Sequence, residues 1–545
     1  MGLDSLIPGT EPETDVVTSK VFINRIVLSD EILLSQITVS KTFNKVASAK
    51  LVFIDGSAPD RDFPLSNNDQ FKPGSEIKIQ LGYHGDVETV FEGIIIKHGI
   101  KVKQSGASVL MIEAKDKAIK LTGARKSAYF IQKTDSDIIT SLAGESIPDV
   151  ETTSVINKQL VQFEATDWDF ILTRAEANSM LVLTDDGNLV IKKPATGTSI
   201  LTATYGDNIF EFEAEMDARR QMKSITGHSW DYTQQTGEDS ETGNSDFTET
   251  GNLSSDDLAG VLGSKIHLSH TGHLTQDQLQ NWADAYAMRN KLSKAVGRVR
   301  IQGNASVKPG ATITLDGVGD RFNGDVFVTG VLHIYDGSWL SDVQFGWQEE
   351  WFYKKDDVME KPAAGLLPGI NGLQIGIVVD VDDTEEGGQY RVKVHVPTIT
   401  SGNEGIWARV ATLDAGAERG VYFRPVANDE VVLGFLNADP REAIILGYLH
   451  SKDTNKSPLP ENEGSLEFGF VTKEKIKLIF DDTNKRMTLS VKTASGEKSI
   501  ILNDDSGAME LKDENSNSIK MEASGITIQA GRGNVTIKGT QVMIN

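Results

Sequence analysis

Apolar and polar residues alternate with a period of two along the C-terminal part of the chain. The segment KIKLIF, residues 475–480, places Ile476, Leu478 and Phe480 on one side of an extended strand, because successive side chains of a strand point to opposite faces. Segments rich in Asp, Asn and Gly, such as DDTN directly after it, separate this strand from those that follow. The pattern predicts short strands joined by tight turns, in an imperfect repeat of roughly 20 residues.

The phase of this alternation changes at glycines near the C-terminus. Ile528 has an even number, Val535 an odd one and Val542 an even one again, with a glycine between each pair. Glycine permits a sharp bend that resets which face points inward. Strands this short cannot cover their edges and one apolar face within a single copy. We therefore predict that several copies of residues 465–545 wind around a common axis, each strand pairing with a neighbouring chain. The alternatives are a single-chain β-solenoid and a loosely ordered tail.

The predicted core of this assembly consists of the apolar residues that share the inner face of these strands. After Phe480 no aromatic residue follows, and after Pro460 no proline, which suits a narrow core of small and β-branched side chains in uninterrupted strands. The predicted core residues are Ile476, Leu478, Phe480, Leu489, Val491, Leu502, Leu511, Ile519, Met521, Ile526, Ile528, Val535 and Ile537.

Five further strands precede this region, at residues 374–381, 389–396, 406–412, 430–436 and 443–449. Turns rich in Gly, Asp, Asn and Pro separate them. Their number and length predict a compact five-stranded barrel of the OB type.

The N-terminal half combines strands with two helices. Strands at 20–28, 36–43, 48–54, 76–82, 87–97 and 107–114 predict a barrel that ends near Leu121. DWDFILTRAEANS predicts a helix with Asp167 as N-cap and a buried face of Phe170, Ile171 and Ala175. A second helix begins at the capping pair Thr275 and Gln278. The polar stretch 233–252 predicts an exposed, mobile loop.

Composition narrows the possible functions. A chain of 545 residues is too long for one core and predicts roughly three to five domains. Its net charge of -24 argues against binding nucleic acid or an anionic membrane by electrostatic attraction. From Ser465 onward, however, 11 Lys plus Arg balance 11 Asp plus Glu, so copies of the tail can pack without mutual repulsion.

The N-terminus and the absence of cysteine bear on location and chemistry. The start, MGLDSLIPGTEPETDVV, is acidic where a signal peptide would be basic and then apolar, so we expect synthesis in the cytoplasm without a signal peptide. The chain has no cysteine, which excludes disulfides, thiolate nucleophiles and Cys-based metal sites.

Three histidines lie close together in HLSHTGH, at His267, His270 and His273. Imidazole is a common zinc ligand, but no carboxylate follows at metalloprotease spacing. On a strand His270 would face away from the other two. We therefore favour a solvated loop over a metal site at these weak candidates, and no other metal, cofactor or catalytic motif is predicted.

Four stretches of sequence, in chain order, carry a family pattern. They are FKPGSEIKIQLGYHGDVETVFEGIIIKHGIK at 71–101, FEATDWDFILTRAEANSMLVLTDDGNLVIKKP at 163–194, PGATITLDGVGDRFNGDVFVTGVLHIYDGSWLSDVQFGW at 309–347, and the motifs YRVKVHVP, WARV and RPVANDEVVLGFLNADPREAIILGYLH within 372–451. These resemble the first hub barrel, the DWDF helix and hairpin, the second hub barrel and the OB module of VgrG proteins, the spikes of type VI secretion and related contractile injection systems.

The resemblance implies a mainly β homotrimer: a hub of two β-barrels with small α/β insertions, an OB-fold collar and a C-terminal intertwined, triangular β-helix needle. The implied domains are an N-terminal tail at 1–19, hub barrel 1 at 20–122, an α+β hub segment at 123–215, hub barrel 2 at 216–355 with the exposed loop 233–252, a linker at 356–372, the OB collar at 373–450, a linker at 451–464 and the needle at 465–545.

The same resemblance implies a mechanical role and its partners. Inner tube and baseplate proteins would bind the hub, a PAAR-like tip protein would contact Val542, Met543, Ile544 and Asn545, and effectors are possible cargo. The spike would pierce the target membrane by force, bind no nucleic acid and reach the extracellular space or target cell on firing. Type VI secretion, an extracellular injection particle and a phage tail remain alternatives.

An enzyme is the competing hypothesis. Tailspike-like glycan-degrading enzymes are also trimeric and rich in β-structure. Some phage relatives insert a lysozyme domain between the OB module and the needle, but only about a dozen residues follow His450 before the first needle strand, too few for a domain. Residues 481–545 also contain no aromatic residue to line a sugar-binding groove. We therefore expect no enzymatic activity.

Overall fold

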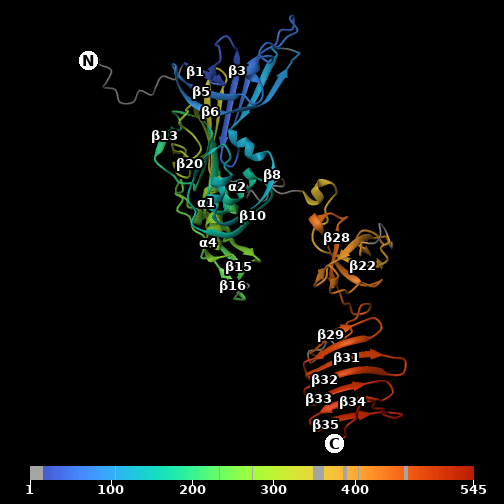
Figure 1. Ribbon diagram of the computed structural model, residues 1–545. Helices are drawn as coiled ribbons and strands as arrows, with labels where there is room; N and C mark the ends of the chain where they lie inside the picture. The colour runs from blue at the N-terminus through green and yellow to red at the C-terminus, as the bar shows by residue number, and fades with distance from the viewer. Residues whose placement is uncertain are drawn as a thin grey trace, which may run out of the picture. The chain divides into compact units, whose positions relative to one another are not determined.

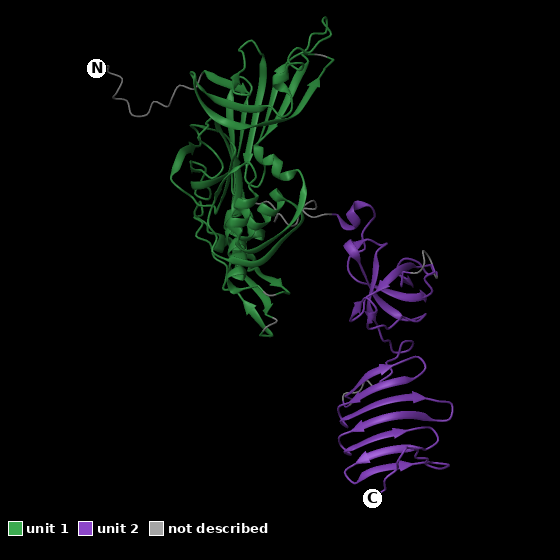
Figure 2. Cartoon of the chain, in the orientation of Figure 1, with its two compact units in different colours: residues 1–360 green, residues 361–545 purple. Residues whose placement is uncertain are grey.

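The structure is a computed structural model that describes residues 16–104, 106–231, 234–272, 274–347, 361–384, 389–402, 404–459, 464 and 466–544. The chain divides into two compact units, Met1–Glu360 and Lys361–Asn545 (Figure 2). Both are mostly β, as predicted. In the described residues, no helix combines the length and the hydrophobicity that a membrane span requires.

A single 13-stranded sheet runs through the first unit (Figure 1). Its central joint is the antiparallel pairing of β3 with β20, from Ile37↔Tyr335 to Thr42↔Gly330. The strands lie in the order β14 (Ile209–Met216), β18 (Ala295–Gln302), β21 (Trp339–Phe345), β20 (Gly324–Tyr335), β3 (Leu34–Thr42), β4 (Ser48–Ile54), β7 (Val109–Lys115), β6 (Asp86–Lys101), β5 (Glu76–Tyr83), β1 (Val17–Ile23) and β2 (Ile26–Val27), and β19 (Thr312–Asp316) connects β20 to β13 (Ser199–Thr204).

Two hydrophobic cores pack against this sheet. The first gathers side chains of the N-terminal strands, including Phe53 and Phe71, whose ring centroids lie 5.2 Å apart. The second gathers side chains such as Val299 and Ile313 from the later strands. The sequence predicted two separate barrels for these regions. The structure differs, because β3 and β20 join both sets of strands into one sheet, and the described ladders of this unit do not close.

An α+β segment interrupts the strands of the first unit. Its helix α2 (Asp167–Ala177) buries Phe170, Ile171 and Ala175, as predicted. The predicted N-cap is wrong by one residue, because Thr166 Oγ1 accepts the hydrogen bond from the Asp169 amide at 3.0 Å. The segment also contains β8 (Arg125–Thr134), α1 (Asp135–Leu142), β9 (Ile147–Val150), β10 (Ile156–Thr166), β11 (Leu181–Asp185) and β12 (Asn188–Lys192). Three short helices lie elsewhere in the first unit: η2 (Asp69–Phe71), η3 (Lys117–Thr122) and η4 (Ala218–Arg220).

The second predicted helix is α4 (Gln276–Leu292), and the capping box of Thr275 and Gln278 is confirmed. It packs against β15 (Ser224–Asp231), which pairs with β16 (Thr236–Asp239) and β17 (Lys265–His270). Helix α3 (Ser255–Leu262) was not predicted.

The stretch 233–252 is more ordered than the sequence predicted, although Thr233 lies outside the described residues. Four of its residues form β16, and the Phe247 ring packs edge-on against Phe327 at 6.1 Å. The Lys294 ammonium group donates a hydrogen bond to the carbonyl oxygen of Thr250. None of the described residues of this stretch is buried, so the predicted exposure is confirmed, whereas the strand β16 was not predicted.

The second unit begins with a closed five-stranded barrel, and its strands match the five predicted ones. Val394, Leu433 and Ile445 are fully buried in its core. The barrel order is β22 (Gln374–Asp380), β23 (Val392–His395), β24 (Ile406–Val410), β28 (Ala443–Tyr448) and β27 (Glu430–Phe435). The shorter elements are η6 (Pro362–Gly365), β25 (Ala415–Gly416), β26 (Arg419–Gly420) and η8 (Leu436–Ala438).

A seven-stranded antiparallel sheet follows the barrel (Figure 1). Each strand pairs with the next one of the same chain, so the prediction that each pairs with a neighbouring copy is wrong for this sheet. The strands are β29 (Glu467–Val471), β30 (Ile476–Asp481), β31 (Arg486–Lys492), β32 (Glu497–Asn503), β33 (Ala508–Lys512), β34 (Ser518–Glu522) and β35 (Gly525–Gln529).

Candidate interface on the C-terminal sheet

Asx-type turns fix the register of the C-terminal sheet. After β30, the Asp481 carboxylate accepts hydrogen bonds from the Asn484 backbone amide at 3.0 Å and from its side-chain amide at 2.8 Å. Before β34, Asp513 binds Asn517 in the same way. These bonds lower the pKa of both carboxyl groups, with Asn484 and Asn517 as the main causes. Because the aspartates stay ionised, the turns keep their acceptors.

The register places the large apolar side chains of all seven strands on one side of the sheet, which we term the apolar face. Two ladders of directly paired residues cross it from β29 to β35. The apolar face consists of Phe468, Phe480, Met487, Leu502, Met509, Met521 and Ile526 in one ladder, Phe470, Leu478, Leu489, Ile500, Leu511, Ile519 and Ile528 in the other, and the pair Ile476 and Val491 beside them.

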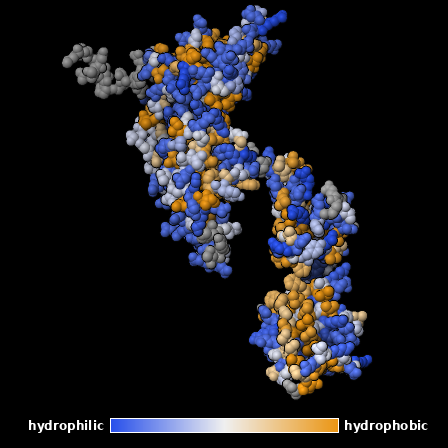
Figure 3. Space-filling model, viewed as in Figure 1, coloured by the Kyte–Doolittle hydropathy of each residue, from blue (hydrophilic) through white to orange (hydrophobic). Residues whose placement is uncertain are grey.

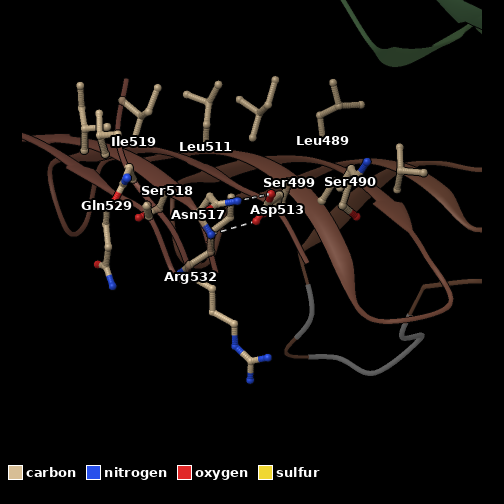
Figure 4. A pocket seen from close by; sticks show the side chains of 18 residues that line it. Leu489, Ser490, Ser499, Leu511, Asp513, Asn517, Ser518, Ile519, Gln529 and Arg532 are labelled. Atoms are coloured by element: carbon tan, nitrogen blue, oxygen red, sulfur yellow. Dashed lines mark hydrogen bonds between the residues drawn. The ribbon is translucent and has the colours of Figure 1, made fainter. Parts of the chain in front are cut away.

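The opposite side of the sheet is mainly polar. Figure 4 shows Leu489, Leu511 and Ile519 pointing to one side of the sheet, while Gln529 and Arg532 point to the other. Charged side chains on the polar side form ion pairs within the chain, such as Lys512 with Glu510 and Arg486 with Asp481. The two sides therefore differ as the surface and the interior of a protein do.

The apolar face is uncovered in the single chain. Leu489 and Leu511 are each 40% exposed, and Ile526 is 69% exposed. None of the seven clusters of buried hydrophobic residues in the described chain includes a residue of this sheet. Figure 3 shows a continuous band of hydrophobic residues over it. A contiguous patch of this kind marks an interaction surface.

Burying the apolar face would release a substantial free energy. Removing the remaining exposed area of one such leucine from water contributes about 1 kcal/mol. The face holds sixteen large apolar side chains, so its cover must be an apolar surface of similar extent.

Eleven of the thirteen predicted core residues lie on the apolar face, and the structure thus brings them together. Val535 and Ile537 lie on no strand. The sequence prediction missed Phe468, Phe470, Met487, Ile500 and Met509. The alternation in EFGFV could have revealed the first two, but three consecutive apolar residues in SIILN left the phase of β32 ambiguous.

The apolar face continues onto the barrel that precedes it. The Phe423 and Phe470 rings stack at 5.5 Å with an interplanar angle of 11°. The Tyr448 hydroxyl donates a hydrogen bond to the Phe423 carbonyl oxygen at 2.9 Å, which holds this loop against the barrel. The aromatic residues of the apolar face all lie on β29 and β30, the two strands that follow the barrel in the chain.

The end of the chain is also exposed. Val542, Met543 and Ile544 are 49%, 81% and 90% exposed and belong to no strand, and Asn545 lies outside the described residues. Beside the last strands a hollow is lined by side chains of both faces, among them Ile528, Gln529 and Arg532 (Figure 4).

The histidine candidates do not form a metal site in the described residues. His267 and His270 belong to β17 rather than to the predicted loop, at positions that face opposite sides. The His267 ring pairs with the Thr226 hydroxyl at 2.9 Å, whereas His270 Nδ1 contacts Gly272. His273 lies outside the described residues. The described part of the chain contains no group of three His, Cys, Asp or Glu side chains that could hold a metal ion.

Three protein-family models match consecutive parts of the chain. Residues 13–336 match the Alg8 N-terminal domain. Residues 374–450, the closed barrel, match the type VI secretion system/phage-baseplate injector OB domain. Residues 488–545 match the phage baseplate V C-terminal trimerisation domain, which begins within β31 and covers most of the apolar face.

The chain is also similar to individual proteins. The chain is 36% identical over 105 residues to the actin cross-linking toxin VgrG1 of Vibrio cholerae, a match that covers 18% of this chain and 9% of that protein. A tail protein from Neisseria meningitidis is 14% identical, with a TM-score of 0.46, over 62% of this chain and 98% of its own. A type VI secretion component from E. coli is 13% identical, with a TM-score of 0.39, over 79% of this chain and all of its own.

Proposed function

Because the chain belongs to the family of the Alg8 N-terminal domain and continues into the injector OB and baseplate trimerisation domains of VgrG-type spikes, we propose that it is the trimeric spike of a contractile injection system. The uncovered apolar face carries this proposal. Its sixteen apolar side chains lie on a sheet that has no buried core of its own.

A trimer would cover the apolar face of each C-terminal sheet. When three sheets face a common axis, each apolar face packs against the other two, and the polar sides with their internal ion pairs remain in water. The matched trimerisation domain supports the number three. The thirteen predicted core residues, with Val535 and Ile537 continuing below β35, would line this interior.

The trimer would act mechanically. Sheath contraction would drive an inner tube with the spike at its front, and the backbone ladders of three sheets would carry the axial load. Residues 20–355 would bind tube and baseplate, 373–450 would form the collar, and 465–545 would form the shaft that pierces the target envelope. Val542, Met543, Ile544 and Asn545 would contact a PAAR-like tip protein, and effectors would travel as cargo.

The comparisons give no support to a glycan-degrading enzyme. The toxin relative shares only 9% of its length with this chain, so its activity does not transfer. Incubating the purified protein with peptidoglycan and surface polysaccharides would reveal turnover if the enzyme hypothesis were correct.

Sedimentation of the full chain tests the trimer. We expect the wild-type protein to sediment as a trimer, and the double variant Leu489→Glu, Leu511→Glu to be monomeric or aggregated, because two carboxylates per chain would be buried unpaired. The control, Thr488→Glu with Thr527→Glu, adds the same charge on the polar side of the sheet and should remain trimeric. A stable wild-type monomer whose C-terminal sheet resists proteases would overturn the proposal.

A further inference from the structure

The first unit contains a second hollow, of about 770 Å³, far from the C-terminal sheet in sequence. Four parts of the chain line it: the hairpin of β5 and β6, residues between Leu201 and Phe210 where β13 leads into β14, the segment 301–305 at the end of β18, and Trp339 on β21. We refer to it as the Trp339 hollow, after its largest lining residue.

Aromatic rings form the inner lining of the Trp339 hollow. The Tyr83 and Trp339 rings stack at 5.4 Å, and the Tyr83 hydroxyl donates to the Gly303 carbonyl oxygen and accepts from the Gln302 amide, each at 3.0 Å. A Cβ on Gly303 would lie 2.1 Å from the indole, so only glycine fits there. Trp339 is 2% exposed, and its Nε1 has no acceptor among the described residues. This lining is a rigid, preformed surface.

Acidic side chains complete the lining. Asp86, Glu88 and Asp207 line the hollow and are exposed, and none of them forms an ion pair within the described chain. On the same hairpin, Glu92 does pair with Lys78, at 2.7 Å. The Phe210 side chain, 56% exposed, adds a further apolar wall. Three carboxylates that form no ion pair with another described residue, together with His84, therefore line an aromatic and apolar cavity.

This combination matches a cationic side chain. Carboxylates neutralise a guanidinium or ammonium group, and aromatic faces attract it while the apolar walls accept its methylene stem. We infer that the Trp339 hollow binds a lysine or arginine side chain presented by a different protein that docks on the first unit.

The charge of the first unit favours a different protein over a second copy. Residues 1–360 contain 34 Lys plus Arg and 52 Asp plus Glu, so two first units repel each other while a basic surface is attracted. The inference does not depend on the proposed trimer, because every residue that carries it lies in the first unit. The inference about the Trp339 hollow would hold even if the protein did not form a trimer.

Titration of the full chain with a small probe tests the inference. The probe is N-acetyl-arginine methylamide, and its neutral control is the citrulline analogue of the same shape; binding is measured by saturation-transfer NMR. We expect the arginine probe to bind and the citrulline probe to bind at least about tenfold more weakly. The triple variant Asp86→Asn, Glu88→Gln, Asp207→Asn should weaken arginine binding by a similar factor.

A matched control removes the same charge elsewhere. Asp30→Asn, Glu31→Gln and Asp320→Asn neutralise three exposed carboxylates of the first unit that do not line the hollow, and binding should be unchanged. Equal binding of both probes, no binding, or equal loss in both triple variants would overturn the inference. A sedimentation coefficient that falls on adding the arginine probe would also overturn it, by showing that a second copy occupies the hollow.

Discussion

The side chain of Lys41 is only 3% exposed, yet it reaches two carboxylates. Its ammonium group pairs with Asp185 and, at 2.8 Å, with Asp186 in the turn between β11 and β12. Lys308 reaches the other oxygen of Asp185 at 3.0 Å. Burial alone would raise the pKa of Asp185, but the two lysines outweigh it and lower that pKa. These ion pairs connect β3 of the large sheet to the end of β11 in the α+β segment.

Lys41→Met should destabilise the first unit strongly. The substitution leaves two partly buried carboxylates with one lysine between them, which costs about 3 kcal/mol. Lys308→Met is the matched control: its side chain is 37% exposed, so its loss should cost about 1 kcal/mol or less. Chemical denaturation measures both. Equal costs would show that burial does not determine the strength of this network.

His333 makes stability depend on pH. Burial, together with the nearby positive charges of Lys41 and Lys308, lowers the pKa of His333 to about 3. The unfolded chain binds a proton on this histidine near pH 6.5, whereas the folded chain does so only near pH 3. The unfolded state therefore holds more protons between these values, and stability falls as the pH drops through this window.

The expected slope is at most about 1.4 kcal/mol per pH unit below pH 6 from this residue. His333→Asn keeps a side chain that can bind the Ser341 hydroxyl, which the histidine contacts at 2.9 Å, and should flatten the slope between pH 6 and 4.5. Denaturation curves across this range measure it. If the variant keeps the wild-type slope, groups other than His333 cause the loss of stability at low pH.

Local sequence signals account for some of these residues and not for others. The capping box at Thr275 and the buried face of α2 follow from spacing along one helix. The partners of Lys41 could not be predicted, because they lie 144 and 145 residues away and no local pattern links them. The shift of the α2 cap from Asp167 to Thr166 reflects two adjacent residues that can both cap a helix.

At the scale of elements, the C-terminal strands show what alternation can predict. It identified the inner face of six strands, because the choice between two faces is local. The alternation did not identify which strand each strand pairs with. The same alternation arises whether a strand pairs with the next strand of its own chain or with a strand of another copy. The tight Asp and Asn turns resolve this point, because they return the chain directly beside the preceding strand.

The aromatic contact between Phe423 and Phe470 predicts coupling between the barrel and the C-terminal sheet. Phe423→Ala and Phe470→Ala should each destabilise the second unit, and the double variant should cost less than their sum by about 1 kcal/mol. Thermal denaturation of the four proteins measures this coupling. Tyr422→Ala, next to the pair and 70% exposed, should have little effect. Full additivity would show that the rings do not support each other.

At the scale of the whole molecule, long-range pairing decides the architecture. The joint between β3 and β20 links residues almost 300 positions apart and merges two expected barrels into one sheet. Sequence patterns predicted the N-terminal strands of this sheet, but neither the later strands nor the pairing across the joint. The closed barrel of the second unit was predictable, because its five strands lie close together along the chain and sequence neighbours usually pair in a sheet.

The distribution of buried side chains makes a final prediction about assembly. All seven buried clusters end before residue 446, so the large sheet and the barrel have cores of their own, whereas the C-terminal sheet has none. A chain that ends at Leu459 should therefore fold, remain soluble and sediment as a monomer. A chain that ends at Gln529 keeps all seven strands and should stay trimeric, which separates the loss of the apolar face from the loss of the terminal residues. If the chain that ends at Leu459 is still a trimer, the first unit or the barrel holds the copies together, and the apolar face must have a different partner.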